Sequence, residues 1–151
     1  MKILKDIHFK IVDESNEKLV RKVSLKPDQD DFIETVDEYL AEAKEYKQWQ
    51  PVAIYHNEDV IGFAMYGSFG PNRHTWIDRI IIDQKYQGQG LGKEAMKGLI
   101  KKVSEEYKVA VLYLSIIEEN KVAERLYKQI GFKYTNKNDP NGELIFEYKV
   151  H

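Results

Sequence analysis

The sequence contains no cysteine, which excludes disulfide bonds, thiolate metal sites and a cysteine nucleophile. It also lacks a signal-peptide hydrophobic stretch and any apolar run of membrane-spanning length. The histidines have no ligand spacing, so we expect no bound metal: His8, His56, His74 and His151. A net charge of -2 and a pI of about 6.1 give no overall field that attracts nucleic acid or an anionic membrane. We therefore expect a cytoplasmic protein with neither kind of partner.

The length of 151 residues suits one domain with a sizeable core, and we expect residues 1–151 to form it. Apolar patterning predicts strands at 3–12, 52–55, 60–66, 76–82, 109–117, 132–134 and 144–150. It predicts a short helix carrying Leu19, Val20 and Val23, a helix over about 28–45, and two more after residues 90 and 120. This order, β-α-α-β-β-β-α-β-α-β-β, indicates a mixed α/β sandwich.

One stretch, residues 78–93, combines an apolar strand, a polar turn and a glycine-rich loop that opens into a helix. Glycines alternate at Gly88, Gly90 and Gly92, so little side chain separates the backbone from a ligand. The helix carries one apolar stripe, made of Leu91, Ala95, Met96, Leu99, Ile100, Val103 and Tyr107. Its first N–H groups lack helical partners and lie at the positive end of the helix dipole. The pattern predicts a phosphate or pyrophosphate site.

Two common phosphate-binding motifs do not fit this loop. A Walker A loop needs Ser or Thr after Gly-Lys, whereas Glu94 follows Lys93. A dinucleotide fingerprint needs Gly-x-Gly-x-x-Gly, and Gly92 comes one residue too early. The loop resembles instead the Gln/Arg-x-x-Gly-x-Gly/Ala signature by which GNAT-superfamily N-acetyltransferases hold the pyrophosphate of acetyl-CoA: Gln87-Gly88-Gln89-Gly90-Leu91-Gly92.

A second segment resembles the other GNAT signature, Asn-x-x-Ala-x-x-Leu/Phe-Tyr-x-x-x-Gly-Phe, at every key position. It runs from Asn120 to Phe132 and carries Ala123, Leu126, Tyr127 and Gly131. The two signatures lie in the right order, and the resemblance covers essentially the whole chain. It implies an α/β GNAT (acyl-CoA N-acyltransferase) fold, with a mixed, mostly antiparallel sheet flanked by helices, and an acetyl-CoA-dependent N-acetyltransferase activity. We expect Val122, Leu126 and Ile130 of this segment to be core residues.

A narrower resemblance is to bacterial spermine/spermidine N-acetyltransferases. It rests on shared residues in several segments: Gln29, Phe32–Glu34, Leu40, Ala43, Pro51, Ile54-Tyr55, Gly62–Gly67, Tyr86–Gly88, Tyr113–Ser115 and Asn141–Glu143. Parts of this pattern are shared with aminoglycoside-like members of the superfamily. The resemblance implies direct acetyl transfer from acetyl-CoA to a primary amine of a polyamine, in a ternary complex.

The resemblance also implies which residues hold the coenzyme. Backbone groups of the central strand would align the pantetheine arm, and one of its N–H groups near Ile81 or Ile82 would meet the oxyanion. The glycine loop would hold the pyrophosphate, and the start of the next helix would contact the coenzyme from the other side. The expected coenzyme residues are Ile80, Ile81, Ile82, Gln87, Gly88, Gln89, Gly90, Leu91, Gly92, Lys93, Asn120, Lys121, Val122, Ala123 and Tyr127.

Two side chains are candidates for moving protons. A thiol has a pKa of ~8.5 and a tyrosine ~10, so Tyr127 can protonate the departing CoA sulfur. Asp78 lies where polyamine acetyltransferases carry a glutamate, and it can receive the amine proton through water. Its unperturbed pKa of ~3.9 matches an amine poorly. A substrate-charge partner or a structural ion pair is an equal alternative for Asp78.

The segment 28–45 carries eight acidic residues against one basic residue, Lys44. Composition alone favours a solvated helix face over a groove for a polycation, but the narrower resemblance reverses that order. The candidate substrate residues are Glu34, Asp37, Glu38, Asp78 and Tyr113. Two alternatives stay open: an acceptor of another kind (a protein amino group, an amino sugar or an amino acid), and a non-catalytic acyl-CoA-binding module. The family often dimerises, so a homodimer is possible.

Overall fold

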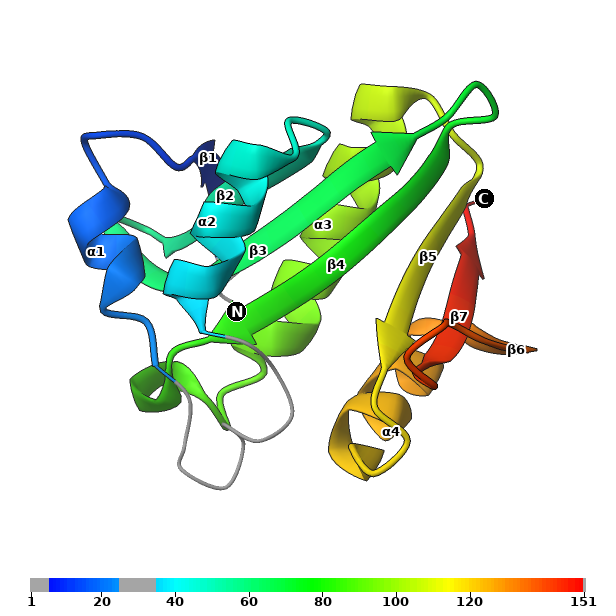
Figure 1. Ribbon diagram of the computed structural model, residues 1–151. Helices are drawn as coiled ribbons and strands as arrows, with labels where there is room; N and C mark the ends of the chain where they lie inside the picture. The colour runs from blue at the N-terminus through cyan, green and yellow to red at the C-terminus, as the bar shows by residue number, and fades with distance from the viewer. Residues whose placement is uncertain (1–5, 25–34, 151) are drawn as a thin grey trace.

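The computed structural model describes residues 6–24 and 35–150. Over these residues the elements follow in the predicted order (Figure 1). They are β1 (Ile7–Ile11), α1 (Glu17–Arg21), α2 (Val36–Glu45), β2 (Trp49–His56), β3 (Asp59–Phe69), β4 (His74–Ile82), the 3-10 turn η2 (Gln84–Tyr86), α3 (Leu91–Tyr107), β5 (Val111–Ile116), α4 (Lys121–Ile130), β6 (Lys133–Asn138) and β7 (Leu144–Lys149).

The described strands form one seven-stranded sheet in the order β1-β2-β3-β4-β5-β7-β6. Its neighbouring strands are antiparallel except for β4 and β5, which run parallel. The crossover that this parallel pair requires contains α3. The prediction of a mixed, mostly antiparallel α/β sheet flanked by helices is therefore confirmed.

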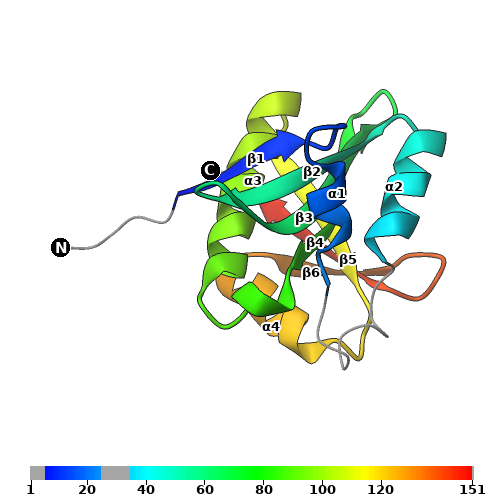
Figure 2. The same cartoon turned by 90° about the vertical axis from the view of Figure 1, so that its left-hand side faces the viewer.

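Helices cover both faces of the sheet, with α3 on one side and α2 on the other (Figure 2). The stripe of α3 predicted from its spacing packs into one core with Ile77, Leu112 and Leu114, and Tyr107 lies at its margin. On the opposite face, Val20 of α1 and the buried side of α2 pack against Phe63, Met65 and Ile81. The central strands are thus covered on both faces, as their apolar character predicts.

Strand β4 departs from regular alternation at a β-bulge. Arg79 pairs with Met65 of β3 and Ile77 pairs with Tyr66, which leaves Asp78 as the extra residue. Because of the bulge, Ile77 and Ile80 both contact the α3 core, while Arg79 reaches the side of α2. The two charged residues of this otherwise apolar strand, Asp78 and Arg79, thus lie at the bulge.

Strands β4 and β5 pair at Trp76 and Tyr113 and then diverge toward their carboxyl ends (Figure 1). Figure 1 also shows that the start of α3 and the start of α4 lie at this end of the sheet. The two segments with GNAT-like signatures, 87–92 and 120–132, therefore begin near the same opening.

Two sequence predictions need correction. The helix predicted over 28–45 does not run through residue 35, because Thr35 is extended and caps α2 through a capping box with Glu38. The residues before it, including Glu34, lie outside the described part. Val122 is not a core residue: its side chain is 73% exposed, because it lies in the first turn of α4 on the open side of the cavity described below.

The close approach of β3 and β4 at Gly62 predicts that Gly62→Ala lowers the stability of the fold. An added Cβ would lie 2.2 Å from the carbonyl oxygen of Ile81, so β4 must shift. We expect a loss of about 2–3 kcal/mol in the free energy of unfolding, measured by urea denaturation. Gly92→Ala is the control, because its Cβ would make an ordinary 3.6 Å contact with Ile82. Equal stability of the two variants would contradict this packing.

Candidate active site

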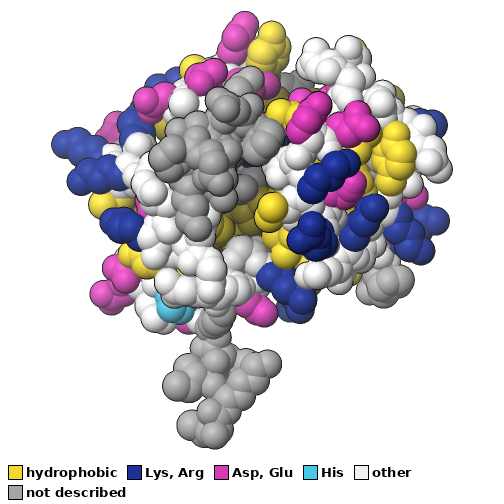
Figure 3. Space-filling model, turned by 90° about the horizontal axis from the view of Figure 1, so that it is seen from below, with side chains coloured by type: hydrophobic (Ala, Val, Ile, Leu, Met, Phe, Trp, Pro, Cys, Tyr) yellow, Lys and Arg dark blue, Asp and Glu magenta, His cyan; other side chains and the backbone are white. Residues whose placement is uncertain are grey.

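A cavity of about 410 Å³ opens where β4 and β5 part. Its walls come from β4, the glycine loop, the first turns of α3 and α4, and β5. Ten of the residues predicted from the sequence line it: Asp78, Ile80, Ile82, Gln87, Gly88, Gly92, Asn120, Val122, Ala123 and Tyr127. Seen from below, hydrophobic side chains lie in a hollow, and Lys and Arg side chains gather at one side of it (Figure 3).

The glycine loop leaves the start of α3 open to a ligand. Gly88 and Gly90 have φ values of 80° and 76°, a left-handed conformation that favours glycine. Gly90 is the N-cap of α3 and has no side chain to satisfy the first N–H groups of the helix. Apart from its two chain neighbours, no atom of residues 6–24 and 35–150 lies within 4 Å of the position that a Cβ on Gly88 would occupy. This backbone fits an anionic diphosphate.

Side chains fix the two loops that border the cavity. Gln87 donates from Nε2 to the carbonyl oxygen of Ile82 at 2.8 Å, which ties the glycine loop to the end of β4. Asn120 accepts a hydrogen bond from the N–H of Ala123 at 3.2 Å and caps α4. The leading polar residue of each signature thus sets the geometry of its own loop.

Tyr127 projects into the cavity from α4, on the wall opposite β4. Its ring packs against Phe132 at 5.9 Å, and the chain turns back beneath it at Gly131, where α4 ends as predicted. Burial raises the pKa of Tyr127 to about 12, and the positive charge of Arg79 acts in the opposite direction. The phenol is therefore protonated at neutral pH and available as a proton donor.

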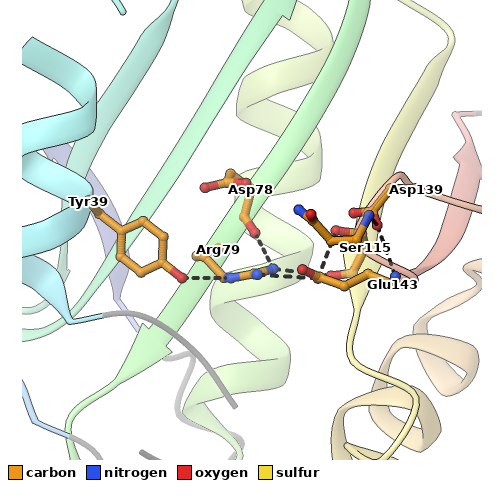
Figure 4. A network of polar contacts seen from close by, with 7 residues as sticks. Tyr39, Asp78, Arg79, Ser115, Asp139 and Glu143 are labelled. Carbon is orange, nitrogen blue, oxygen red and sulfur yellow. Dashed lines mark hydrogen bonds and ion pairs between the residues drawn. The ribbon is translucent and has the colours of Figure 1, made fainter. Parts of the chain in front are cut away.

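Arg79 forms a polar network that the sequence analysis did not identify (Figure 4). Its Nε donates to the Tyr39 hydroxyl of α2 at 2.7 Å, and its Nη1 donates to the carbonyl oxygens of Asp78 and Ser115 at 3.0 and 3.2 Å. Its Nη2 pairs with Glu143 at 3.3 Å. Burial lowers the pKa of Arg79, but Tyr39, Asp78 and Glu143 outweigh it, and the net effect is to raise that pKa. The guanidinium therefore stays charged.

The available signal for this network was a pair of charged residues, Asp78 and Arg79, within a largely apolar strand, because an uncompensated charge is rarely placed in a sheet core. Its partners come from segments far apart in the chain, residues 39, 115 and 143. Local sequence patterns carry no information about such pairings, so only the folded chain reveals them.

Several predicted site residues do not line the cavity. Ile81 is buried in the core beneath α1 and α2, so its backbone alone remains a candidate for contact. Tyr113 lies against Trp76 with ring centroids 5.4 Å apart. The remaining predicted coenzyme residues are also absent from the cavity lining: Gln89, Gly90, Leu91, Lys93 and Lys121. Their coenzyme contacts stay a prediction.

The acidic residues of α2 have structural partners. Asp37, whose side chain is 69% exposed, pairs with Arg21 of α1. Glu38 belongs to the capping box of Thr35, and neither residue lines the cavity. Glu34 lies outside the described residues. The contacts of Asp37 and Glu38 in the structure are thus with other protein groups on or near α2. Their contact with a substrate stays a prediction.

Two features are absent from residues 6–24 and 35–150. No three histidine, aspartate or glutamate side chains in these ranges gather as a metal site would require. No helix in them is long and apolar enough to pass through a bilayer.

Sequence comparison relates the chain to known acetyltransferases. Residues 17–132 match the acetyltransferase (GNAT) family. The chain is 39% identical over 145 residues to the spermine/spermidine N(1)-acetyltransferase of Bacillus subtilis (strain 168), and the match covers 92% of this chain and 95% of that protein.

Solved structures support the fold. The PaiA N-acetyltransferase of Thermoplasma acidophilum, in complex with coenzyme A, superposes with a TM-score of 0.69 at 14% identity, covering 96% of this chain and 99% of that one. The ribosomal-protein-S18-alanine N-acetyltransferase of Escherichia coli gives 0.68 at 18% identity, covering 96% and 94%. The predicted GNAT fold is confirmed.

Proposed function

We propose, on the premise that this chain belongs to the acetyltransferase (GNAT) family, that it acetylates a primary amine of a polyamine such as spermine or spermidine. As a member of that family it is an acetyl-CoA-dependent N-acetyltransferase. The observation that carries the choice of acceptor is the 39% identity, over nearly the full length of both chains, to a spermine/spermidine N(1)-acetyltransferase. A protein amino group, an amino sugar or an amino acid is the alternative acceptor.

The proposed coenzyme site follows the cavity from one end to the other. Backbone N–H groups at Gly88 and at the start of α3 would bind the diphosphate, because Gly90 provides no side-chain cap for the helix and the helix dipole favours an anion. The backbone of Ile80 and Ile82 would align the pantetheine arm, since β4 has no strand partner on the cavity side beyond Trp76 within the described sheet. Acetyl-CoA supplies a thioester, whose acyl carbon bonds to the amine nitrogen while the sulfur leaves.

The proposed proton donor to the departing sulfur is Tyr127. Its phenol is protonated at neutral pH and lies in a cavity wall made by the second signature segment. The acceptor nitrogen starts protonated and gives up two protons, one before it attacks and one as the amide forms. The departing sulfur gains one proton, and the other is released to solvent. Asp78, on the opposite wall, is the proposed acceptor of the amine proton through water, or else the partner of the substrate charge.

The proposal has three further parts. We infer a cytoplasmic location and the absence of nucleic-acid and membrane partners from the composition, and a homodimer from the frequency of dimers in the family. Contacts of Glu34, Asp37, Glu38 and Tyr113 with distal ammonium groups also belong to the proposal. None of these alters the chemistry assigned to Tyr127 and Asp78.

The acceptor is tested by following thiol release from acetyl-CoA with a panel of amines. We expect kcat/KM for spermidine or spermine to exceed that for a simple alkylamine at least about tenfold, because a polyamine has further ammonium groups that can pair with acidic side chains; a tenfold ratio corresponds to about 1.4 kcal/mol. An amino sugar, an amino acid or a peptide amine that outperforms both polyamines would identify the alternative acceptor. Coenzyme binding without thiol release for any amine would reject the catalytic proposal.

The role of Tyr127 is tested by Tyr127→Phe, which removes the hydroxyl and preserves the ring packing on Phe132. We expect kcat to fall about 100-fold or more, with little change in the affinity for acetyl-CoA, since only the proton donor is lost. Tyr46→Phe is the matched control, because Tyr46 lies exposed at the end of α2. A kcat equal to that of the control would remove Tyr127 from the mechanism.

A further inference from the structure

Arg79 is the charged group most firmly fixed beside the cavity. Its side chain is 17% exposed, and its hydrogen bonds run to residues on α2, β4 and β5 and to the segment before β7. Figure 4 shows the guanidinium reaching from β4 toward β5, between Tyr39 on one side and Ser115 and Glu143 on the other. These hydrogen bonds fix the position of the Arg79 guanidinium and of its positive charge.

Glu143 is the counter-charge of this arginine, and it too is held in place. Its Oε1 accepts from Arg79 Nη2 at 3.3 Å and from the hydroxyl of Ser115 at 3.2 Å. Its backbone N–H donates to Asp139 Oδ1 at 2.9 Å, and its carbonyl accepts from the N–H of Asp139 at 2.9 Å. Tyr39 and Asp78 stabilise the guanidinium as well, so Glu143 is one of several groups that offset the charge of Arg79.

The charge of Arg79 acts on groups inside the cavity. The described titratable groups near it are Tyr39 of α2, Asp78 of β4, Tyr127 of α4 and Glu143 before β7. Its effect reaches across the cavity, since it opposes the upward shift that burial gives to the pKa of Tyr127. An acceptor nitrogen placed between Asp78 and Tyr127 lies within the same field.

A protonated acceptor amine cannot attack, and its pKa of ~10.4 keeps it protonated at neutral pH. A carboxylate such as Asp78 holds the amine in the protonated form, whereas a nearby positive charge favours the neutral form. A positive charge near the reacting nitrogen would therefore oppose the effect of Asp78 and favour the neutral, reactive amine.

We propose that Arg79 and Glu143 form a pair that sets the electrostatic potential at the acceptor end of the cavity. Arg79 favours loss of the proton from the reacting nitrogen, and Glu143 limits how strongly it does so. Both are positioning residues, because they act on the proton of another group and need not touch the acyl carbon. The inference rests on the proposed transfer to an amine, and it assigns two residues that neither GNAT signature contains.

The test is the pH dependence of kcat for spermidine and for a simple alkylamine, measured at saturating amine and acetyl-CoA, because kcat reports ionisations in the enzyme–substrate complex. Arg79→Met should move the rising limb of the profile to higher pH by about one unit, because the acceptor keeps its proton longer. Glu143→Gln should move the limb in the opposite direction, because the guanidinium then lacks its counter-charge. Arg79→Lys should return the limb toward that of the wild type.

Arg73→Met is the control, since Arg73 is exposed in the turn between β3 and β4 and donates to the carbonyl oxygen of Tyr107. It should leave the limb unchanged.

Shifts of Arg79→Met and Glu143→Gln in the same direction, or in neither direction, would overturn the inference. If Arg79→Met does not fold, the downward shift of Glu143→Gln decides alone. Wild-type protein that acetylates no amine would defeat the proposed function as well, whereas normal acetylation without the opposite shifts would defeat this inference only.

Discussion

The site depends on the separation of two parallel strands. Because β4 and β5 pair at Trp76 and Tyr113 and then diverge, one edge of β4 is left without a neighbouring strand in the described sheet. The bulge at Asp78 lies just beyond that pair. Arg79 bridges the gap with hydrogen bonds to main-chain oxygens on both strands. The strands are thereby kept apart by a fixed amount, where their hydrogen bonds would otherwise continue.

The opening brings together residues that are distant in the sequence. The start of α3 supplies N–H groups that no N-cap side chain satisfies, β4 supplies backbone and Asp78 to the cavity lining, and α4 supplies Tyr127. Much of the lining is apolar, so the few charged and polar groups act with little screening by water. The positive charge of Arg79 can therefore influence the pKa values of groups elsewhere in the cavity, such as Tyr127.

Local patterns predicted most of the elements and their order along the chain. The α3 stripe depends on apolar residues three or four positions apart, and the turn before α3 depends on single glycines. The family resemblance likewise named ten residues of the cavity wall. The start of α2 was wrong because Thr35 competes for the helix through its own side chain, and Val122 was wrong because an apolar residue at an open cavity looks like a core residue. The Arg79 network was missed because it joins residues 39, 79, 115 and 143, a pairing that only tertiary structure creates.

The most direct measurement of the central claim is a crystal structure of the protein with coenzyme A. The account predicts that the diphosphate lies on the backbone N–H groups between Gly88 and the first turn of α3, and that the sulfur lies within hydrogen-bonding reach of the Tyr127 hydroxyl. A coenzyme bound outside the opening between β4 and β5, or a sulfur remote from that hydroxyl, would contradict it.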